Sequence, residues 1–235
     1  MAGNGCFAEK IVVDAARVAL MPKGMDFPVA AALPMTYGTS LYALKQRAEL
    51  KAGETLLVLG AAGGVGLSAV EIGKAMGAKV IAAASSDEKI NICLKHGADE
   101  AFVYPSGTLD KEQQKELSTK IKELTAGKGA DVIYDPVGGS FSEPALRSIA
   151  WEGRFLVIGF AAGEIPKLPL NLALLKGCQI VGVFWGAWTM MCQGENEKNF
   201  EELYDLYSAG KINPEISDRF SLEESAAAIA HLKDR

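Results

Sequence analysis

The sequence has few of the residues that metal sites and disulfide scaffolds require. Among 235 residues there are two histidines and four cysteines, Cys6, Cys93, Cys178 and Cys192. No two cysteines form a Cys-x-x-Cys pair, which excludes a structural zinc site of that type. No residues have the spacing of a catalytic zinc site either. We therefore expect reduced thiols in a reducing compartment and no bound metal.

Long apolar runs and basic clusters are also missing. No apolar core follows a basic start at the N-terminus, so no signal peptide is visible. The most apolar stretch, Cys178 to Met191, is too short to span a bilayer. Lys and Arg number 24 against 29 Asp and Glu, a net charge of −5 without a basic run. A membrane or nucleic-acid partner is therefore not expected.

The remaining composition is that of a globular protein. Hydrophobic residues make up 49% of the chain, charged residues 23% and aromatic residues 8%, which excludes collagen-like, mucin-like and disordered classes. At about 150 residues per domain, the length indicates between one and two domains. Such a chain can bury a core without disulfides or metals.

Short apolar strands alternate with amphipathic helices through the middle of the chain. The predicted strands are 55–61, 79–84, 100–105, 130–137, 154–160 and 179–185. The predicted helices between them include 65–76, 87–96 and 111–125. This alternation predicts an α/β fold with a doubly wound parallel sheet of the Rossmann type, flanked by helices on both faces.

The two ends of the chain look different from this middle part. Phe7 to Leu20 has strand character without a following helix. Pro28 to Gln46 is an Ala-rich helical region that we expect to break near Pro34 and Gly38. Near the C-terminus, the segment 221–224 (Ser-Leu-Glu-Glu) has the pattern of a helix capping box.

A glycine-rich segment, LLVLGAAGGVG, lies between the first strand and the first helix of the alternating region. A pyrophosphate can bind the free amides at a helix N-terminus only where no side chain blocks its approach. In the Gly-x-Gly-x-x-Gly register the match is Ala61, Gly63 and Gly66, with alanine in place of the first glycine. Because the motif follows a strand and opens a helix, it predicts a dinucleotide site, and a tight turn without a ligand is the weaker interpretation.

The end of the second strand bears on which dinucleotide binds. NAD sites place an acidic residue there to hold the ribose 2′-hydroxyl. Here the strand ends in small neutral residues, and Ser85 and Lys89 could receive a 2′-phosphate. Asp87 could instead serve an NAD ribose, and Ser85 with Glu88 could form only a capping box. We favour NADPH over NADH.

Several segments together resemble the zinc-free quinone oxidoreductase (zeta-crystallin-like) branch of the medium-chain dehydrogenase/reductase superfamily. They are FAEKIVV, AALPMTYGTSLYAL, GETLLVLGAAGGVG, KHGADEAFVY, DVIYDPVGG and RFLVIGFAAGEIPKLPLN, and the resemblance extends over the whole sequence. It implies a Rossmann cofactor domain together with the remnant of a GroES-like catalytic domain. Zinc-dependent relatives take a ligand from the part matching residues 31–40, which here holds no Cys, His, Asp or Glu.

The resemblance implies a domain division and a truncation. Residues 1–37 are expected to be the C-terminal remnant of the catalytic domain with a hinge helix. Residues 38–190 would form the Rossmann domain, and residues 191–235 would be helices returning to the catalytic domain. Because the family continues beyond this sequence at both ends, we expect a truncated chain. Its location is expected to be cytoplasmic, with a mitochondrial one left open.

The resemblance also implies roles for individual residues in cofactor binding. Ser85, Lys89 and Tyr104 match positions near the adenosine 2′-phosphate. The residues matching the pyrophosphate loop are Ala61, Gly63, Gly64, Val65 and Gly66. The residues matching positions at the nicotinamide or the cofactor phosphate are Thr39, Phe160, Phe184 and Arg235. Tyr104 could equally be a half-buried strand tyrosine.

These features together predict an NADPH-dependent oxidoreductase that reduces quinones or other α,β-unsaturated carbonyls by hydride transfer without zinc. No acid–base pair stands out. Tyr37 and Tyr42 are weak candidates for a proton donor, and packing tyrosines are the stronger interpretation. The alternative is a non-catalytic nucleotide-binding module with an RNA-binding or structural role. The apolar edge of the sixth strand predicts a homodimer joined through it.

Overall fold

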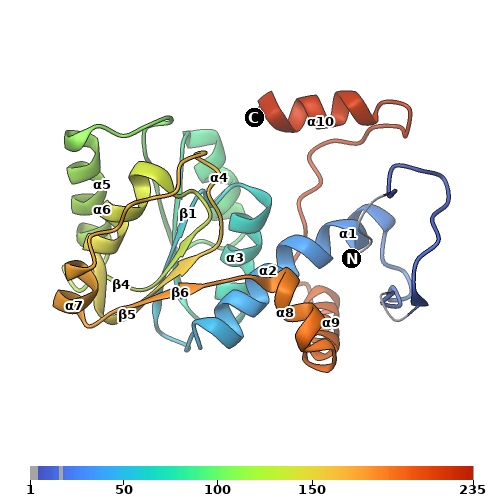
Figure 1. Cartoon of the computed structure of the whole chain (residues 1–235), viewed down its shortest axis with the longest axis horizontal. Coiled ribbons are helices and arrows are strands. Elements are labelled where there is room, and N and C mark those ends of the chain that lie inside the picture. Colours follow the sequence, from blue (N-terminus) through green and yellow to red (C-terminus); the bar gives the residue numbers. More distant parts are fainter. Residues whose placement is uncertain (1–4, 16–17, 235) are drawn as a thin grey trace. The chain divides into compact units, whose positions relative to one another are not determined.

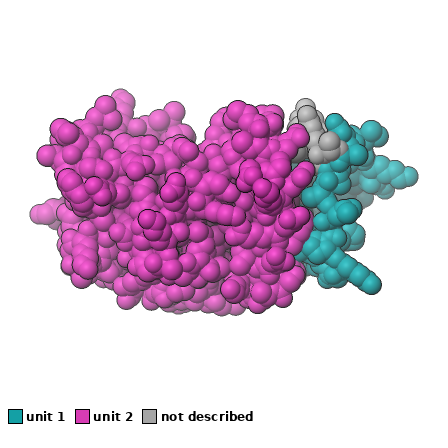
Figure 2. Space-filling view, turned by 90° about the horizontal axis from the view of Figure 1, so that it is seen from below, with its two compact units in different colours: residues 1–31, 215–235 teal, residues 32–214 magenta. Residues whose placement is uncertain are grey.

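The computed structural model describes residues 5–15 and 18–234. Contacts divide the chain into two compact units (Figure 2). One unit combines residues up to Ala31 with those from Glu215 onward, and the other is Ala32–Pro214. The sequence-based division after residues 37 and 190 remains a prediction.

The larger unit is built on a six-stranded parallel sheet, as expected, with the order β3-β2-β1-β4-β5-β6 (Figure 1). The strands are β1 (Thr55–Leu59), β2 (Lys79–Ala84), β3 (Glu100–Val103), β4 (Ala130–Asp135), β5 (Ile149–Val157) and β6 (Gln179–Gly182). Leu56 to Leu59 are fully buried, because a central parallel strand is covered on both faces. This strand order confirms the doubly wound Rossmann fold.

Helices cover both faces of the sheet, with α3 and α4 on one side and α5 and α6 on the other (Figure 1). In the larger unit the helices are α2 (Gly38–Leu41), α3 (Gly64–Ala75), α4 (Asp87–Lys95), α5 (Lys111–Leu124), α6 (Ser142–Arg147), α7 (Asn171–Lys176), α8 (Trp185–Met191) and α9 (Gln193–Ser208). A 3₁₀ turn, Gly139–Phe141, precedes α6. Across the described ranges, no helix has both the length and the apolar character needed to cross a membrane.

The strand ends differ from the predicted ones in a consistent way. Five of the predicted strands continue past the last residue of the observed strand, because the residues that follow belong to loops at the carboxyl edge of the sheet. The fifth strand also begins earlier than predicted, at Ile149. Its first part contains Glu152 in the left-handed region, with φ 58°, and the pairing with β4 shifts register there. Such an irregularity conceals a strand from pattern analysis.

The expected break near Pro34 and Gly38 is wrong. The π-helical segments Leu33–Tyr37 and Tyr42–Arg47 flank α2, so that residues 33–47 form one uninterrupted helix, here called the long helix. Pro34 lies in the first turn of the π-helical segment, and Ala32 before this segment already has helical dihedral angles. Gly38 is needed for packing, because a Cβ there would lie 2.7 Å from Cζ2 of Trp185.

The smaller unit corrects two further expectations. Phe7 to Leu20 forms no strand within its described residues, because a strand needs a hydrogen-bonding partner strand. Helix α1 is Phe27–Ala32, and α10 is Ser225–Asp234. The capping pattern is half realised, since the Glu224 carboxylate accepts the Ser221 N–H at 2.9 Å while α10 begins only at Ser225.

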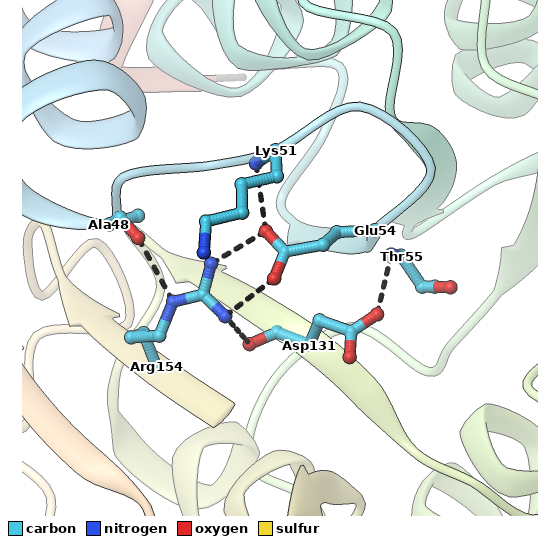
Figure 3. A network of polar contacts seen from close by, with 6 residues as sticks. All are labelled: Ala48, Lys51, Glu54, Thr55, Asp131 and Arg154. Atoms are coloured by element: carbon cyan, nitrogen blue, oxygen red, sulfur yellow. Dashed lines mark hydrogen bonds and ion pairs between the residues drawn. The ribbon is translucent and has the colours of Figure 1, made fainter. Parts of the chain in front are cut away.

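An arginine ties three strands together at the amino edge of the sheet (Figure 3). Arg154 of β5 donates from Nη1 and Nη2 to the two carboxylate oxygens of Glu54, just before β1, at 2.9 and 2.6 Å. Its Nε donates to the Ala48 carbonyl at 2.9 Å. Asp131 of β4 accepts the Thr55 N–H at 2.7 Å. This network is named here the amino-edge network.

Opposing effects act on the carboxylate of Glu54. Burial alone would raise its pKa, but the Arg154 guanidinium and the Lys51 N–H outweigh burial, and the pKa lies below the usual 4.5. The side chains of Arg154 and Glu54 are only 15% and 21% exposed. The pair is therefore better shielded from solvent than a surface ion pair, and it should contribute more to stability.

Replacing Arg154 by methionine is expected to lower the free energy of unfolding by about 2 kcal/mol, because Glu54 loses a two-point partner. Urea denaturation at pH 7 measures the change. Arg147→Met is the matched control, since Arg147 pairs with Glu143 within one helix and is half exposed; its loss should be about 0.5 kcal/mol or less. The Arg154→Met effect should shrink below pH 4.5, because the stabilisation from Glu54 is lost as the pH falls through its lowered folded-state pKa.

Candidate functional site

The carboxyl edge of the sheet holds the residues that the sequence analysis singled out. Strands β1 and β4 are neighbours, and the connections after them lead to helices on opposite faces. A crevice at such a switch point is where doubly wound sheets bind ligands. The loop after β1 and the loop after β4 meet there, because a Cβ on Gly60 would lie 2.9 Å from the Cγ2 atom of Val137.

The glycine loop (residues 60–66) makes a tight turn into α3. Gly60 has φ 57°, and its carbonyl oxygen accepts the Gly63 N–H at 3.0 Å. Gly63 is the N-cap of α3 and provides no side-chain cap. The next three amides, of Gly64, Val65 and Gly66, occupy the first helical positions, where helix geometry offers them no acceptor. They are suited to bind an anion.

The loop has no space for side chains at its closest points. A Cβ on Gly66 would lie 2.3 Å from the Gly60 oxygen and 2.8 Å from the Ala61 Cα. At Gly64 it would lie 3.2 Å from Cγ2 of Thr36 on the long helix. Ala61 is fully buried, and its N–H donates to the Ala83 carbonyl at the end of β2. The loop is thus fixed to the sheet through Ala61, while its last three amides have no acceptor within the helix.

The loop after β4 is shaped by an aspartate that the sequence analysis missed. The buried carboxylate of Asp135 accepts the N–H groups of Val137 and Gly138, both at 2.9 Å, and the Ser142 hydroxyl at 2.6 Å. Burial raises the pKa of Asp135 despite these donors. The sequence Asp-Pro-x-Gly after a strand is the signal for such a turn.

The end of β2 carries the residues predicted at the 2′-phosphate. The Lys89 ammonium donates to the Ser85 hydroxyl at 3.1 Å, so these two side chains lie together. The N-cap of α4 is Ser86, which accepts the Lys89 N–H at 3.3 Å. The alternative interpretation, a capping box of Ser85 with Glu88, is therefore wrong, because the cap is the next residue, Ser86. Asp87 lies in the first turn of the same helix.

Tyr104 lies at the carboxyl edge but faces the glycine loop. It is 7% exposed, and its hydroxyl oxygen accepts the Gly60 N–H at 3.1 Å. Its ring contacts Phe141 with a centroid separation of 4.8 Å. This environment agrees better with the interpretation of Tyr104 as a packed tyrosine at the end of a strand than with a side chain that is free to contact a ligand.

The two tyrosines considered as proton donors are both buried. The Tyr37 hydroxyl donates to Oε2 of Glu71 at 2.5 Å, and Oε1 of Glu71 contacts Nδ1 of His96 at 2.6 Å. The Tyr42 ring stacks on Trp188 with centroids 4.5 Å apart. The packing interpretation describes both environments. The sequence analysis did not single out Glu71. The signal for it was a lone acidic residue inside an apolar helical stretch.

A second buried group of hydroxyls supports the first turn of α3. The Ser40 Oγ atom lies 2.8 Å from both the Ser68 Oγ and the Tyr134 hydroxyl, and it donates to the Val65 carbonyl at 3.1 Å. The Ser68 hydroxyl lies 3.1 Å from the Thr36 carbonyl. These contacts join β4, α3 and the long helix directly below the glycine loop, and no local sequence pattern signals them.

The remaining predicted residues lie at the other end of the edge or outside the described part. Phe160 after β5 and Phe184 after β6 are 42% and 76% exposed. Both line a hollow of about 620 Å³ together with Tyr42, Arg47 and Trp188. Thr39 lies half-buried on α2, one helical turn from Thr36. Arg235 lies outside the described residues.

The residues of the carboxyl edge fit a dinucleotide. The amides of residues 64–66 could hold a pyrophosphate, and Gly66 leaves the space that a side chain would fill. Lys89 with Ser85 offers a cation and a hydroxyl for a phosphate. Within the part of the chain that the structure describes, no comparable site for a metal ion is found. The described residues include no group of three or more His, Cys, Asp or Glu side chains arranged to hold one.

Comparisons with known proteins identify the family. Residues 64–207 match the model of the zinc-binding dehydrogenase family. The chain is 36% identical over 234 residues to the quinone oxidoreductase-like protein 2 of Bos taurus, covering 99% of this chain and 65% of that protein. It is 33% identical to a quinone oxidoreductase of Pseudomonas aeruginosa, of which it covers 69%.

A solved structure agrees in fold. The mycobacterial protein Rv1454c, solved in complex with NADPH, superposes with a TM-score of 0.89 at 27% identity, covering 98% of this chain and 69% of that one. The chain thus spans about two thirds of the length of these relatives. It belongs to the zinc-binding dehydrogenase family of the medium-chain dehydrogenase/reductase superfamily and is similar to the quinone oxidoreductases within it.

Proposed function

We propose that this protein is an NADPH-dependent oxidoreductase that reduces quinones or other α,β-unsaturated carbonyls by hydride transfer without zinc. The observation that carries the proposal is the glycine loop at the switch point, where the amides of Gly64, Val65 and Gly66 begin α3 and have no acceptor within the helix. The quinone oxidoreductase names of its relatives support the reaction class.

The proposed cofactor residues divide the dinucleotide among three segments. The pyrophosphate would be held by the glycine loop, from Ala61 to Gly66, where the helix dipole adds attraction for negative charge. Thr39 and backbone groups near Phe160 and Phe184 would orient the nicotinamide, and Arg235 would reach a cofactor phosphate. When bound, NADPH supplies the hydride, and the protein supplies position and a dry surface.

Preference for NADPH over NADH rests on the end of β2. Lys89 and Ser85 are already in contact, so a 2′-phosphate would meet an ammonium and a hydroxyl in a prepared arrangement. The acidic side chain nearest in sequence, Asp87, lies in the first helical turn rather than at the strand end. The NADPH complex of the mycobacterial relative supports this choice.

The substrate surface is proposed at the hollow beside Phe160 and Phe184. Its lining is largely aromatic and aliphatic, which suits a planar acceptor such as a quinone ring. Because the hydroxyl of Tyr37 is bonded inside the protein and the Tyr42 ring is stacked, we propose that the proton comes from solvent. Reduction of a conjugated acceptor without zinc is favoured because residues 31–40 hold no Cys, His, Asp or Glu.

We also propose that the protein is a cytoplasmic homodimer joined through β6, which is an edge strand of the sheet. The Ile180 side chain on this strand is 37% exposed. Pairing two such strands would satisfy their backbone groups and cover apolar surface. No partner other than a small-molecule substrate and this second copy is proposed.

The reaction itself is tested by following NADPH absorbance with a panel of quinones and enones. Turnover of at least one acceptor, dependent on protein concentration, is the expected result. Tight NADPH binding without turnover of any acceptor would favour the alternative, a non-catalytic nucleotide-binding module. Failure to bind either dinucleotide would remove both.

Replacing Lys89 by alanine should weaken NADPH binding about tenfold or more while leaving NADH binding unchanged, because one charge-assisted contact to the 2′-phosphate is lost. Titration followed by cofactor fluorescence measures both dissociation constants. Lys122→Ala, on the exposed face of α5, is the matched control. Equal weakening of both cofactors by Lys89→Ala would mean that the lysine does not select the 2′-phosphate.

Replacing Gly66 by alanine should abolish detectable dinucleotide binding, because the new Cβ would lie 2.3 Å from the Gly60 carbonyl oxygen and displace the loop. Isothermal titration calorimetry measures binding, and circular dichroism checks that the sheet is retained. Gly194→Ala is the control, since no atom lies within 4 Å of its added Cβ. A folded Gly66→Ala protein with wild-type affinity would contradict the assignment of this loop.

A further inference from the structure

The two backbone groups of Gly60 determine the shape of the glycine loop. Its carbonyl oxygen accepts the Gly63 N–H and occupies the space that a Cβ on Gly66 would need, so the direction of this carbonyl closes the turn. Its N–H, which belongs to the preceding peptide unit, donates to the Tyr104 hydroxyl at 3.1 Å. With φ at 57°, Gly60 is in a region that only glycine occupies without strain. Because a glycine backbone is flexible, a contact from outside the loop is needed to fix the position of the Gly60 N–H.

Tyr104 reaches Gly60 across the end of β2. The sheet order is β3-β2-β1; Tyr104 follows β3, and Gly60 follows β1. The Tyr104 N–H donates to the Ala84 carbonyl at 2.9 Å, and the Ala61 N–H donates to the Ala83 carbonyl at 3.0 Å. Both segments are therefore anchored on neighbouring residues of β2, whose alanine side chains leave room for the tyrosine ring.

The ring of Tyr104 is held in one place. It is packed on Phe141 and belongs to the same buried cluster as Leu59 and Ala83. Burial raises its pKa to about 12, further above physiological pH than the usual 10. The neutral hydroxyl accepts the Gly60 N–H through a lone pair of its oxygen. A neutral hydroxyl on a fixed ring provides a rigid acceptor.

We propose that Tyr104 is a positioning residue for the dinucleotide pyrophosphate: its hydroxyl oxygen holds the Gly60 N–H and thereby fixes the bend after which the amides of residues 64–66 begin α3. The inference rests on the proposed dinucleotide binding. It gives Tyr104 a role different from the contact with the 2′-phosphate that the resemblance implied. It also makes a distinct prediction, since the pyrophosphate is common to NADPH, NADH and ADP-ribose.

The test is the Tyr104→Phe protein, which keeps the ring and removes only the acceptor. Dissociation constants for NADPH, NADH and ADP-ribose are measured by isothermal titration calorimetry. Loss of one hydrogen bond that orients the site should weaken all three ligands about five- to tenfold. Tyr204→Phe is the matched control and should leave all three unchanged, because the Tyr204 ring lies on α9 beside Phe200.

The outcomes separate this inference from the proposed function. Wild-type affinity of Tyr104→Phe for NADH and ADP-ribose would overturn the positioning role, even if NADPH bound more weakly. Absence of binding by the wild-type protein would instead overturn the proposed function. An independent measurement is hydrogen exchange at the Gly60 amide of the wild-type protein. Protection like that of strand amides, lost in Tyr104→Phe, supports the inference, and rapid exchange in the wild type contradicts it.

Discussion

The geometry of the carboxyl edge depends on one close approach between two backbone segments, where the Gly60 carbonyl oxygen occupies the space that a side chain on residue 66 would need. This approach allows α3 to begin at Gly64, close behind the end of β1 at Leu59. Other contacts support the same edge of the sheet. Asp135 holds the loop after β4 in shape, and Ser40 with Ser68 contacts the first turn of α3.

The two edges of the sheet are built differently. At the amino edge, Arg154 of β5 donates to the Glu54 carboxylate just before β1, and Asp131 of β4 accepts the Thr55 N–H of β1. The amino-edge network thus joins these three strands. At the carboxyl edge, Phe184 is exposed and the Lys89 ammonium donates to the Ser85 hydroxyl. The stabilising network and the proposed ligand contacts therefore lie at opposite ends of the same strands.

The sequence was sufficient for features that depend on local pattern. Buried strands such as 79–84 and the glycine loop were placed correctly, because each has its own signal in apolar runs or glycine spacing. Features that depend on tertiary packing were not predicted. The long helix continues through Gly38, whose missing side chain leaves the space that the Trp185 ring occupies. The Tyr104 hydroxyl meets Gly60 only because β3 and β1 lie on either side of β2, and residues 44 positions apart carry no shared pattern.

Glu71 shows how a late part of the chain completes an early one. Its carboxylate accepts the Asn213 N–H at 3.1 Å in addition to its contacts with Tyr37 and His96. During synthesis, α3 emerges from the ribosome long before residue 213 does. Until then this carboxylate lacks one of its donors, so the buried cluster reaches its final form only after residue 213 has been made. The region around α3 is therefore expected to mature as a unit, not strand by strand.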